Sequence, residues 1–539
     1  MTRFIFVTGG VVSSLGKGII SSSIGKLLQA RGYKITIQKF DPYINIDPGT
    51  LNPYEHGECY VTVDGMETDL DLGHYERFTG IRTTRGNSVT TGRIYQSVIE
   101  RERRGDYLGK TIQVVPHITN EIKRMMMRED DADDYDFIIT EVGGTIGDIE
   151  SAPFMEAIRQ MRWELAGRAL SVHLTYVPYL KAAGELKTKP TQHSVKELQG
   201  MGIQPDVLIL RTEQHLSDSV RQKVASFCNV DLECVVQSED MASIYEVPVS
   251  MQRQGLDAAI LRKFCIPVGE TPAMTPWHEF LAKQQRAAKT VSIALVGKYD
   301  LQDAYKSIRE SLSLAGTYND CKVKIDFVNS EHLTAATVAE RLSAADGVLI
   351  CPGFGQRGIE GKIIAAQYCR EHDVPTFGIC LGMQMMVVEF ARNVLDYGDA
   401  NSREMDAQTP HNVIDIMEEQ KNITKMGGTM RLGAYACVVR SNSTTARAYA
   451  APDGDDITIM ERHRHRYEFN NTYLDQYEAN GMQCVGTNPD SQLVEIVEMP
   501  ALRWYVGTQF HPEYSSTVLH PHPLFVDFIK TILKPTVTG

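Results

Sequence analysis

The stretch FIFVTGGVVSSLGKGI, residues 4–19, decides the fold of the first half of the chain. It starts with a short apolar run, passes through a Gly/Ser loop and leads into an amphipathic segment at residues 19–31. A second apolar run follows at residues 34–38, and another at residues 137–141 precedes a Gly-Gly pair. A strand, a helix and a strand in this order predict a parallel sheet.

The second half repeats this pattern. Apolar runs at residues 291–296, 347–351 and 375–379 each lead into a glycine- or cysteine-containing turn. We therefore expect an α/β protein with two parallel-sheet domains.

A proline-containing stretch separates the two blocks. Residues 264–289 hold three prolines, and proline removes a backbone donor and fixes φ, so we expect neither a helix nor a strand interior there. The expected organisation is a first domain at residues 1–266, a linker at 267–289 and a second domain at 290–539.

The composition limits the class of protein. Apolar residues make up 42% of the 539 and charged residues 23%, which is typical of globular proteins. The net charge of −13 argues against bulk nucleic-acid binding. Ten cysteines without a CxxC pair indicate reduced thiols. No apolar run approaches the ~18 residues of a membrane span, so we expect no membrane partner, and the acidic charge predicts no nucleic-acid partner. Reduced thiols without a secretion signal predict a cytoplasmic protein.

The loop at residues 9–18 is a candidate phosphate site. It lies between a predicted strand and helix, where backbone N–H groups and the helix dipole attract anions, and Lys17 adds a positive charge. The match to a standard P-loop is incomplete, because Gly18 stands where a Ser or Thr usually contacts magnesium. A bare glycine-rich turn is the alternative.

Carboxylates would then have to hold the magnesium ion. Asp71, and Glu141 at the carboxyl end of a predicted strand, are the candidates, with surface acids as the alternative. The acidic run at residues 129–134 is better interpreted as a solvated loop than as a metal site.

A second candidate site centres on Cys380. The sequence GICLG, residues 378–382, follows an apolar strand and precedes a helix, as in a nucleophile elbow, and the Leu381 N–H is placed to stabilise an oxyanion. His511 follows a strand at residues 505–510, and Glu513 can orient its ring. A buried core cysteine and a structural histidine are the alternative interpretation.

The run RHRHRY at residues 462–467 is strongly basic for an acidic protein. A pocket for a carboxylate or phosphate is the functional interpretation, and a surface strand with two faces is the alternative.

Together these motifs resemble the CTP synthase family over nearly the whole chain. The similarity includes the loop ending SLGKG, the segments KFDPYIN (39–45), GHYERF (73–78) and EVGGTIGDIE (141–150), and GELKTKPTQHS at 184–194. The resemblance implies a dethiobiotin-synthetase-like amidoligase domain followed by a flavodoxin-like class I glutaminase domain.

The family's functional residues carry over to matching positions. The resemblance implies ATP contacts from Ser14, Leu15, Gly16, Lys17, Gly18, Ile19, Asp71 and Asp240, with magnesium on Asp71 and Glu141. It implies UTP or CTP contacts from Ser13, Asp148, Ile149, Glu150, Lys187, Thr188, Lys189, Pro190, Thr191, Gln192 and Lys223. Glutamine would meet Gly353, Leu381, Gly382, Met383, Gln384, Glu404 and Arg466, and Cys380, His511 and Glu513 would form the catalytic triad beside the catalytic Lys17 of the other domain.

One position departs from the family. The usual Pro-Gly-Gly-Phe-Gly is Cys-Pro-Gly-Phe-Gly here, with Pro352 at the second position. Proline has no N–H, so an oxyanion donor is lost if position 352 supplies it and kept if Gly353 does. The sequence leaves both open.

The resemblance also implies the reaction and its partners. ATP would phosphorylate the uracil 4-oxygen of UTP, and ammonia released from a cysteine thioester at the glutaminase site would reach it through an internal passage. GTP activation, CTP inhibition, a homotetramer and filaments are implied too. A cobyrinate amidase and a catalytically weak filament scaffold are the rival hypotheses.

Overall fold

The computed structural model describes residues 1–128, 134–417, 429–452 and 454–534, and the acidic run falls mostly outside this part of the chain. The chain divides into two compact units. Unit 1 comprises Met1–Pro48 and Asp71–Thr275, and unit 2 comprises Gly49–Leu70 and Pro276–Gly539. The segment Gly49–Leu70 thus lies with the second unit, which differs from the continuous first domain expected at residues 1–266.

Unit 1 is built on a sheet of seven parallel strands. The order is β11-β10-β7-β1-β6-β2-β5, so β1 lies between β6 and β7. The strands are β1 (Arg3–Gly9), β2 (Ile35–Asp41), β5 (Ser88–Thr90), β6 (Phe137–Val142), β7 (Ala169–Tyr176), β10 (Val207–Thr212) and β11 (Val235–Glu239). The expected parallel sheet is confirmed.

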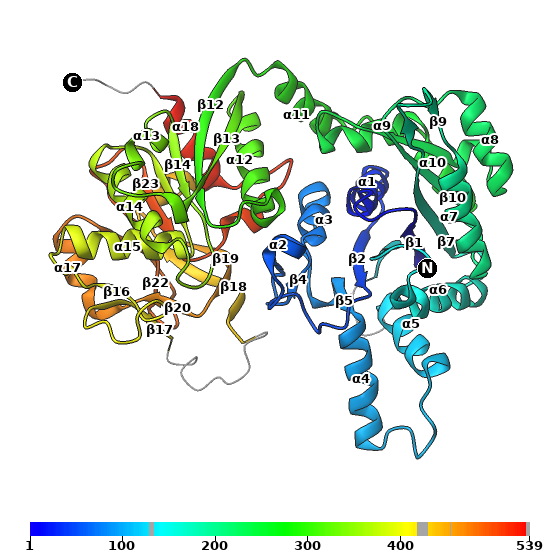
Figure 1. Cartoon of the computed structure of the whole chain (residues 1–539), viewed down its shortest axis with the longest axis horizontal. Coiled ribbons are helices and arrows are strands. Elements are labelled where there is room, and N and C mark those ends of the chain that lie inside the picture. Colours follow the sequence, from blue (N-terminus) through cyan, green and yellow to red (C-terminus); the bar gives the residue numbers. More distant parts are fainter. Residues whose placement is uncertain (129–133, 418–428, 453, 535–539) are drawn as a thin grey trace. The chain divides into compact units, whose positions relative to one another are not determined.

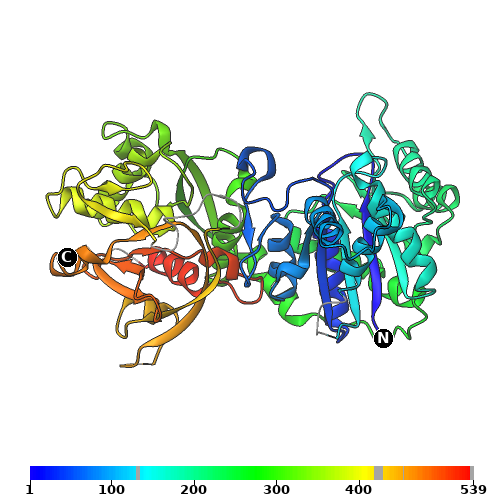
Figure 2. The same cartoon turned by 90° about the horizontal axis from the view of Figure 1, so that it is seen from below.

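Helices cover this sheet (Figures 1 and 2). Phe4 and Phe6 of β1 point into a core that also holds Ile122 and Ile158, whereas Ile5 and Val7 are buried on the opposite face, as the period of a strand requires. The helices are α1 (Lys17–Ala30), α3 (Asp71–Thr79), α4 (Thr91–Arg104), α5 (Thr119–Met127), α6 (Ala152–Glu164), α7 (Lys189–Gly200), α8 (Asp218–Cys228), α9 (Val247–Arg253) and α10 (Leu256–Lys263).

Unit 2 has a mixed sheet of nine strands, in the order β13-β12-β14-β15-β23-β22-β21-β18-β19. The first five are parallel, as expected, and the pairings from β23 to β19 are antiparallel. The strands are β12 (Lys289–Gly297), β13 (Cys321–Asn329), β14 (Gly347–Ile350), β15 (Thr376–Ile379), β18 (Arg431–Val439), β19 (Ile457–His465), β21 (Gln483–Thr487), β22 (Val494–Glu498) and β23 (Tyr505–Thr508). Helices α12 (Lys306–Tyr318), α14 (Ile359–Glu371), α15 (Leu381–Asn393) and α18 (Pro523–Leu533) pack on it.

The expectation of a linker without helix is wrong. Helix α11 (Thr275–Arg286) occupies much of residues 267–289 and buries Trp277, Phe280 and Leu281. Pro276 lies in the first turn, where a missing N–H costs no intrahelical hydrogen bond.

The segment Gly49–Leu70 joins unit 2 through specific contacts. It contains a hairpin of β3 (Tyr60–Val61) and β4 (Glu67–Thr68). The Ala434 N–H donates to the Val63 carbonyl over 2.9 Å. A Cβ atom on Gly65 would lie 2.7 Å from the Leu432 carbonyl oxygen, so this approach to β18 needs glycine.

No helix among the described residues is long and apolar enough to cross a membrane.

Candidate active sites

The phosphate loop of unit 1 follows β1 and ends at α1, whose first residue is Lys17. Gly16 caps the helix at φ 91°, which favours glycine. The Lys17 ammonium donates to the Gly144 carbonyl over 2.6 Å and so reaches the end of β6. Burial lowers the pKa of Lys17, and the charge of Glu141 partly offsets this. The loop therefore offers a helix N-terminus and a buried amine at the same sheet edge.

Three carboxylates surround a lysine that the sequence analysis did not single out. The Lys39 ammonium at the end of β2 donates to Asp71, lies 3.1 Å from Glu141 Oε1 and 3.7 Å from Asp41 Oδ1. The Tyr75 hydroxyl donates to Glu141 over 2.5 Å. The structure thus brings the two predicted magnesium ligands together around one cation.

The pKa values of these acids diverge. Burial raises the pKa of Asp41 to about 6, and burial with the nearby charge of Asp71 raises that of Glu141. For Asp71, burial acts in the same direction, but Lys39 and His74 lower its pKa below the ordinary value. Hence Asp71 is the acid held most firmly ionised.

The incomplete P-loop now has a physical reason. A Cβ atom on Gly18 would lie 2.2 Å from Asp71 Oδ1. A serine or threonine cannot occupy this position without displacing Asp71, so the carboxylate of α3 takes the space of the usual hydroxyl.

A hollow of about 540 Å³ lies beside the loop. It brings together the phosphate loop, the turn after β6 and the first turns of α7. Its lining residues are Val11, Thr145, Ile146, Gly147, Pro190, His193, Ser194 and Glu197. Of the predicted UTP residues, Pro190 lines it directly, and Thr188, Lys189, Thr191 and Gln192 belong to the same helix start.

The remaining predicted nucleotide residues lie on exposed loops and helices. Lys187 donates to Glu185, whose pKa is lowered by this hydrogen bond and by the charge of Lys223, so both predicted lysines face the same carboxylate. Asp240 follows β11 and pairs with Arg211. Ser13 and residues 148–150 are exposed.

In unit 2, Cys380 occupies the turn between β15 and α15 at φ 51°. A Cβ on Gly378 would lie 2.3 Å from Met386 Sδ, and one on Gly382 would lie 2.1 Å from the Ile350 carbonyl oxygen. Both flanking glycines are thus required by close packing. Cys380 therefore has the strained backbone of a nucleophile elbow.

His511 and Glu513 form a buried pair. His511 Nδ1 lies 2.7 Å from Glu513 Oε1, and its buried Nε2 has no hydrogen-bond partner among the described residues. Burial lowers the pKa of His511, but the charges of Glu513 and Cys380 outweigh this and raise it to about 10. Glu513 thus favours the protonated ring during the reaction.

Two amide side chains extend the site beyond the predicted triad. Gln509 Nε2 donates to Cys380 Sγ over 3.6 Å, and Gln384 Nε2 donates to Gln509 Oε1 over 3.2 Å. Gln384 Nε2 also donates to the Tyr467 carbonyl over 2.8 Å, which leaves its buried Oε1 without a partner among the described groups.

The other predicted glutamine residues surround the same turn. Gly353 lies in the loop after β14, which pairs with β15, so this loop borders Leu381, Gly382 and Met383 of the elbow. Glu404 accepts the Gly355 N–H over 2.8 Å. Burial raises the pKa of Glu404, against the lowering charges of Lys298 and Arg466.

The basic run does not form one ligand pocket. Arg462 donates to the Val61 carbonyl over 2.9 Å, and Arg464 lies 2.9 Å from Glu67 Oε1, so both arginines hold the Gly49–Leu70 segment. The Arg462 side chain is buried and that of Arg464 is 14% exposed, which argues against an exposed surface strand as well. Only Arg466 of the three arginines interacts with a predicted ligand residue, Glu404.

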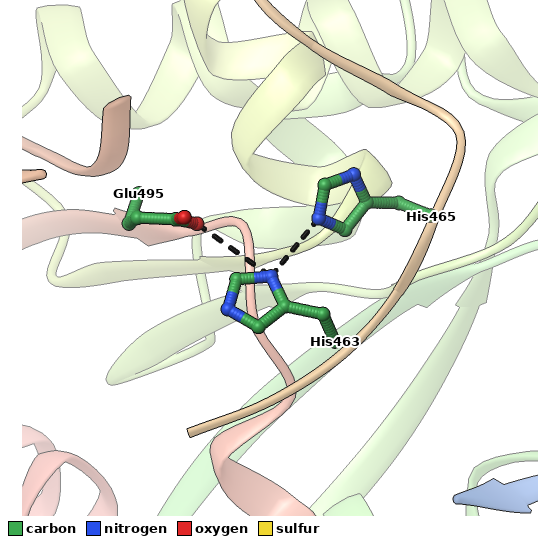
Figure 3. Close-up of side chains that lie close together, drawn as sticks. All are labelled: His463, His465 and Glu495. Atoms are coloured by element: carbon green, nitrogen blue, oxygen red, sulfur yellow. Dashed lines mark hydrogen bonds and ion pairs between the residues drawn. The ribbon is translucent and has the colours of Figure 1, made fainter. Parts of the chain in front are cut away.

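The two histidines of the run belong to a separate cluster with Glu495 (Figure 3). His465 Nδ1 donates to the Tyr467 carbonyl over 3.1 Å, and His463 Nδ1 lies 2.9 Å from His465 Nε2. Arg431 is 2.8 Å from Glu495 Oε1. Although three ligand atoms converge here, this guanidinium supplies the positive charge that a metal would bring.

Sequence reasoning missed Lys39, Gln509 and two buried lysines, Lys298 and Lys362. The signal for Lys39 was a charged residue inside the apolar strand ITIQKFD, because a buried lysine requires partners. Gln509 lies two residues before His511 and offered no comparable signal.

Two family models match the chain. The CTP synthase N-terminus matches residues 3–266, and the class-I glutamine amidotransferase matches residues 300–531. A CTP synthase from Bacteroides thetaiotaomicron is 70% identical over 99% of this chain and 99% of its own length. One from Porphyromonas gingivalis W83 is 62% identical over 99% and 98%. A solved Trypanosoma brucei CTPS glutaminase domain with bound acivicin is 36% identical with a TM-score of 0.42, covering 46% of this chain and 96% of that one. The chain therefore belongs to the CTP synthase family.

Proposed function

We propose that the two sites divide one reaction, the glutamine-dependent amination of UTP. The observation that carries this proposal is the presence in one chain of a complete Cys-His-Glu constellation and a phosphate loop facing clustered carboxylates. The family assignment supports the overall reaction, and the geometry supports the roles of individual residues.

In unit 2, Cys380 attacks the amide carbon of glutamine. His511, oriented by Glu513, takes the thiol proton, and its Nε2 then gives that proton to the departing ammonia. Water then hydrolyses the thioester. The backbone N–H groups of Gly353 and Leu381 are the candidate donors to the oxyanion.

The glutamine substrate needs partners for its polar ends. Gln384 Oε1 is a buried acceptor without a described partner, which suits an N–H of the substrate. Glu404 and Arg466 lie near each other and offer opposite charges, which suit the α-ammonium and α-carboxylate.

In unit 1, the residues suit a triphosphate and its acceptor. Lys17 and the α1 N-terminus hold the ATP phosphates, and residues 14–19 form the loop around them. Asp240, which follows β11 at the same edge of the sheet, is a further ATP contact. The hollow beside α7 suits UTP, whose uracil 4-oxygen takes the γ-phosphoryl group and becomes a leaving group. Ammonia then displaces this phosphate and forms CTP.

The donor set also fits magnesium. Asp71 and Glu141 are hard oxygen donors that already face a cation, and Gly18 leaves room for Asp71 beside the loop. When bound, the ion would neutralise phosphate charge. Asp71, held ionised by Lys39, is the residue best suited to retain it.

The family also suggests regulation and assembly. We infer that CTP inhibits at the UTP residues, that GTP activates glutamine hydrolysis, and that the chain forms homotetramers able to stack into filaments. Ammonia has to pass between the sites in an enclosed passage, since release into water would protonate it.

The test compares glutamine with free ammonia as nitrogen donor for CTP formation from UTP and ATP. We expect wild type to use both donors and Cys380→Ala to use ammonia only. Cys265→Ala, at an exposed cysteine of unit 1, is the matched control and should retain both activities.

Two outcomes would contradict the assignment. Glutamine use by Cys380→Ala would remove Cys380 as the nucleophile. Absence of CTP from either donor in wild type, with filaments still forming, would favour the scaffold hypothesis.

A further inference from the structure

The loop after β14 is held by two lysines that no glutaminase step yet uses. Lys298 and Lys362 are both 0% exposed. Lys362 Nζ donates to the Cys351 carbonyl and, over 3.4 Å, to the Pro352 carbonyl. Lys298 Nζ donates to the Phe354 carbonyl and, over 2.8 Å, to the Gly355 carbonyl. Carbonyls on both sides of Gly353 are therefore fixed by buried amines.

These bonds determine where the next N–H groups point. In a trans peptide the carbonyl oxygen and the following N–H lie on opposite sides of the C–N bond. With the Pro352 carbonyl directed at Lys362, the Gly353 N–H points away from Lys362. Turning this peptide over would break the hydrogen bond from Lys362 to the Pro352 carbonyl.

The loop is also close to the nucleophile. A Cβ on Gly353 would lie 3.6 Å from Leu381 Cδ2 and 2.7 Å from Lys298 Cε, so only glycine fits between the elbow and the lysine stem. Gly353 has φ 155°. Its N–H has no hydrogen-bond acceptor among the described residues. An N–H left free at this place is available to a substrate oxygen.

We propose that Lys362 is a positioning residue for the oxyanion: by holding the Cys351 and Pro352 carbonyls it directs the Gly353 N–H toward the oxygen of the tetrahedral intermediate at Cys380. This arrangement explains how the chain tolerates proline at position 352, because the N–H that donates to the oxyanion belongs to the next residue, Gly353. It rests on the proposed role of Cys380 in glutamine hydrolysis.

Lys298 has a different part in the same loop. It fixes the carbonyls after Gly353, and the Gly355 N–H is the group that Glu404 accepts. Loss of Lys298 should therefore disturb the carboxylate expected to hold the substrate ammonium more than the oxyanion donor. Substitution of Lys298 should raise KM for glutamine, whereas substitution of Lys362 should lower kcat.

The experiment measures three quantities in Lys362→Met, with Lys530→Met, at an exposed lysine of unit 2, as the control. The first is glutamine-dependent kcat. The second is the dissociation constant of glutamate γ-semialdehyde, whose carbonyl carbon adds the Cys380 thiolate reversibly to give a tetrahedral oxyanion. The third is the rate of Cys380 alkylation by iodoacetamide, which needs the thiolate but no oxyanion donor.

We expect kcat in Lys362→Met to fall by about 10²-fold, the cost of losing one oxyanion donor. The aldehyde should bind more weakly, by up to the same factor, while alkylation and ammonia-dependent CTP formation remain near wild type. Lys362→Gln, which keeps a shorter donor, should give an intermediate loss and provides a milder variant if methionine disturbs folding.

Each contrary result has a distinct meaning. If alkylation slows in step with kcat, Lys362 acts on the thiolate as a nearby cation and the positioning role is wrong. If aldehyde affinity is unchanged, the Gly353 N–H does not depend on Lys362. If wild type itself hydrolyses no glutamine, the proposed function fails before this inference is reached.

Discussion

Both candidate sites contain buried lysines, but the lysines have opposite surroundings. In unit 1, Lys39 lies among the carboxylates of Asp41, Asp71 and Glu141. In unit 2, the hydrogen bonds of Lys298 and Lys362 run to backbone carbonyls within the described part of the chain. Charges compensate the first lysine, and peptide dipoles compensate the other two.

The pKa values express this difference. Burial lowers the pKa of Lys298 to about 7 and that of Lys362 to about 8, because dipoles replace lost hydration incompletely. In unit 1 the attraction of Lys39 instead lowers the pKa of Asp71 despite its burial. One site thus holds a buried lysine among carboxylates, and the other holds a backbone loop through its carbonyls.

The largest effect is expected from Glu513→Gln. Glu513 orients the His511 ring and raises its pKa, so its loss should reduce glutamine-dependent CTP formation by about 10³–10⁴-fold, as for other residues that orient a catalytic base. Ammonia-dependent formation should be unchanged. Steady-state assays with the two donors provide the measurement, and equal losses with both donors would contradict a role confined to unit 2.

Lys39→Met tests directly whether Lys39 and the surrounding carboxylates of unit 1 stabilise one another. It leaves the buried carboxylates of Asp41 and Glu141, and the partly exposed one of Asp71, without their central cation, so the unfolding free energy of unit 1 should fall by about 3–5 kcal/mol. Lys362→Met, which frees only carbonyls, should cost unit 2 about 1–3 kcal/mol. Calorimetry with ATP to mark the unit 1 transition would measure both, and equal losses would refute the comparison.

Asp71→Asn should weaken magnesium binding in unit 1 without affecting the glutaminase site. Asp71 is the acid with a lowered pKa, so it contributes most of the charge available to an ion. We expect the magnesium concentration for half-maximal ammonia-dependent activity to rise by about 10–100-fold. Glu156→Gln, at a carboxylate of α6 that pairs with Arg159, is the control. An unchanged magnesium requirement would exclude Asp71 as a ligand.

Local patterns predicted the parts of the sites that lie next to strand ends. The loop with Lys17 and the elbow with Cys380 are short motifs, each between a strand and the helix that follows it, so their parts lie close together in the sequence. The partners of Lys39 and the lysines around Gly353 could not be predicted this way, because they depend on contacts between residues distant in sequence.

The errors have the same physical origin. Helix α11 forms despite its proline because Pro276 lies in the first turn and Trp277 finds a buried position, which no local pattern reveals. The segment Gly49–Leu70 joins unit 2 because Arg462 and Arg464, some 400 residues later, hold it. These arginines bind a carbonyl and a carboxylate of the chain itself, and the sequence alone does not distinguish such partners from those of a ligand.

The smallest effect on catalysis is expected from Glu495→Gln. This variant tests whether the charge of Arg431 keeps the buried Glu495 carboxylate ionised in unit 2. Burial raises the pKa of Glu495 from 4.5 to about 7, although Arg431 acts against this. The folded state therefore binds more protons than the unfolded state between these values, and the stability contributed below pH 4.5 is lost as the pH rises through 7.

The glutamine variant removes this titration. The unfolding free energy of unit 2 should lose a pH dependence of up to about 1.4 kcal/mol per pH unit in that interval, while glutamine-dependent activity stays close to wild type. Denaturation at several pH values measures the slope. Glu513→Gln should change the slope at higher pH instead, between the ordinary histidine value of 6.5 and about 10, because His511 is the group that loses its proton there. An unchanged slope in Glu495→Gln would mean that Arg431 keeps the carboxylate ionised, and that unit 2 too compensates a buried charge with a charge.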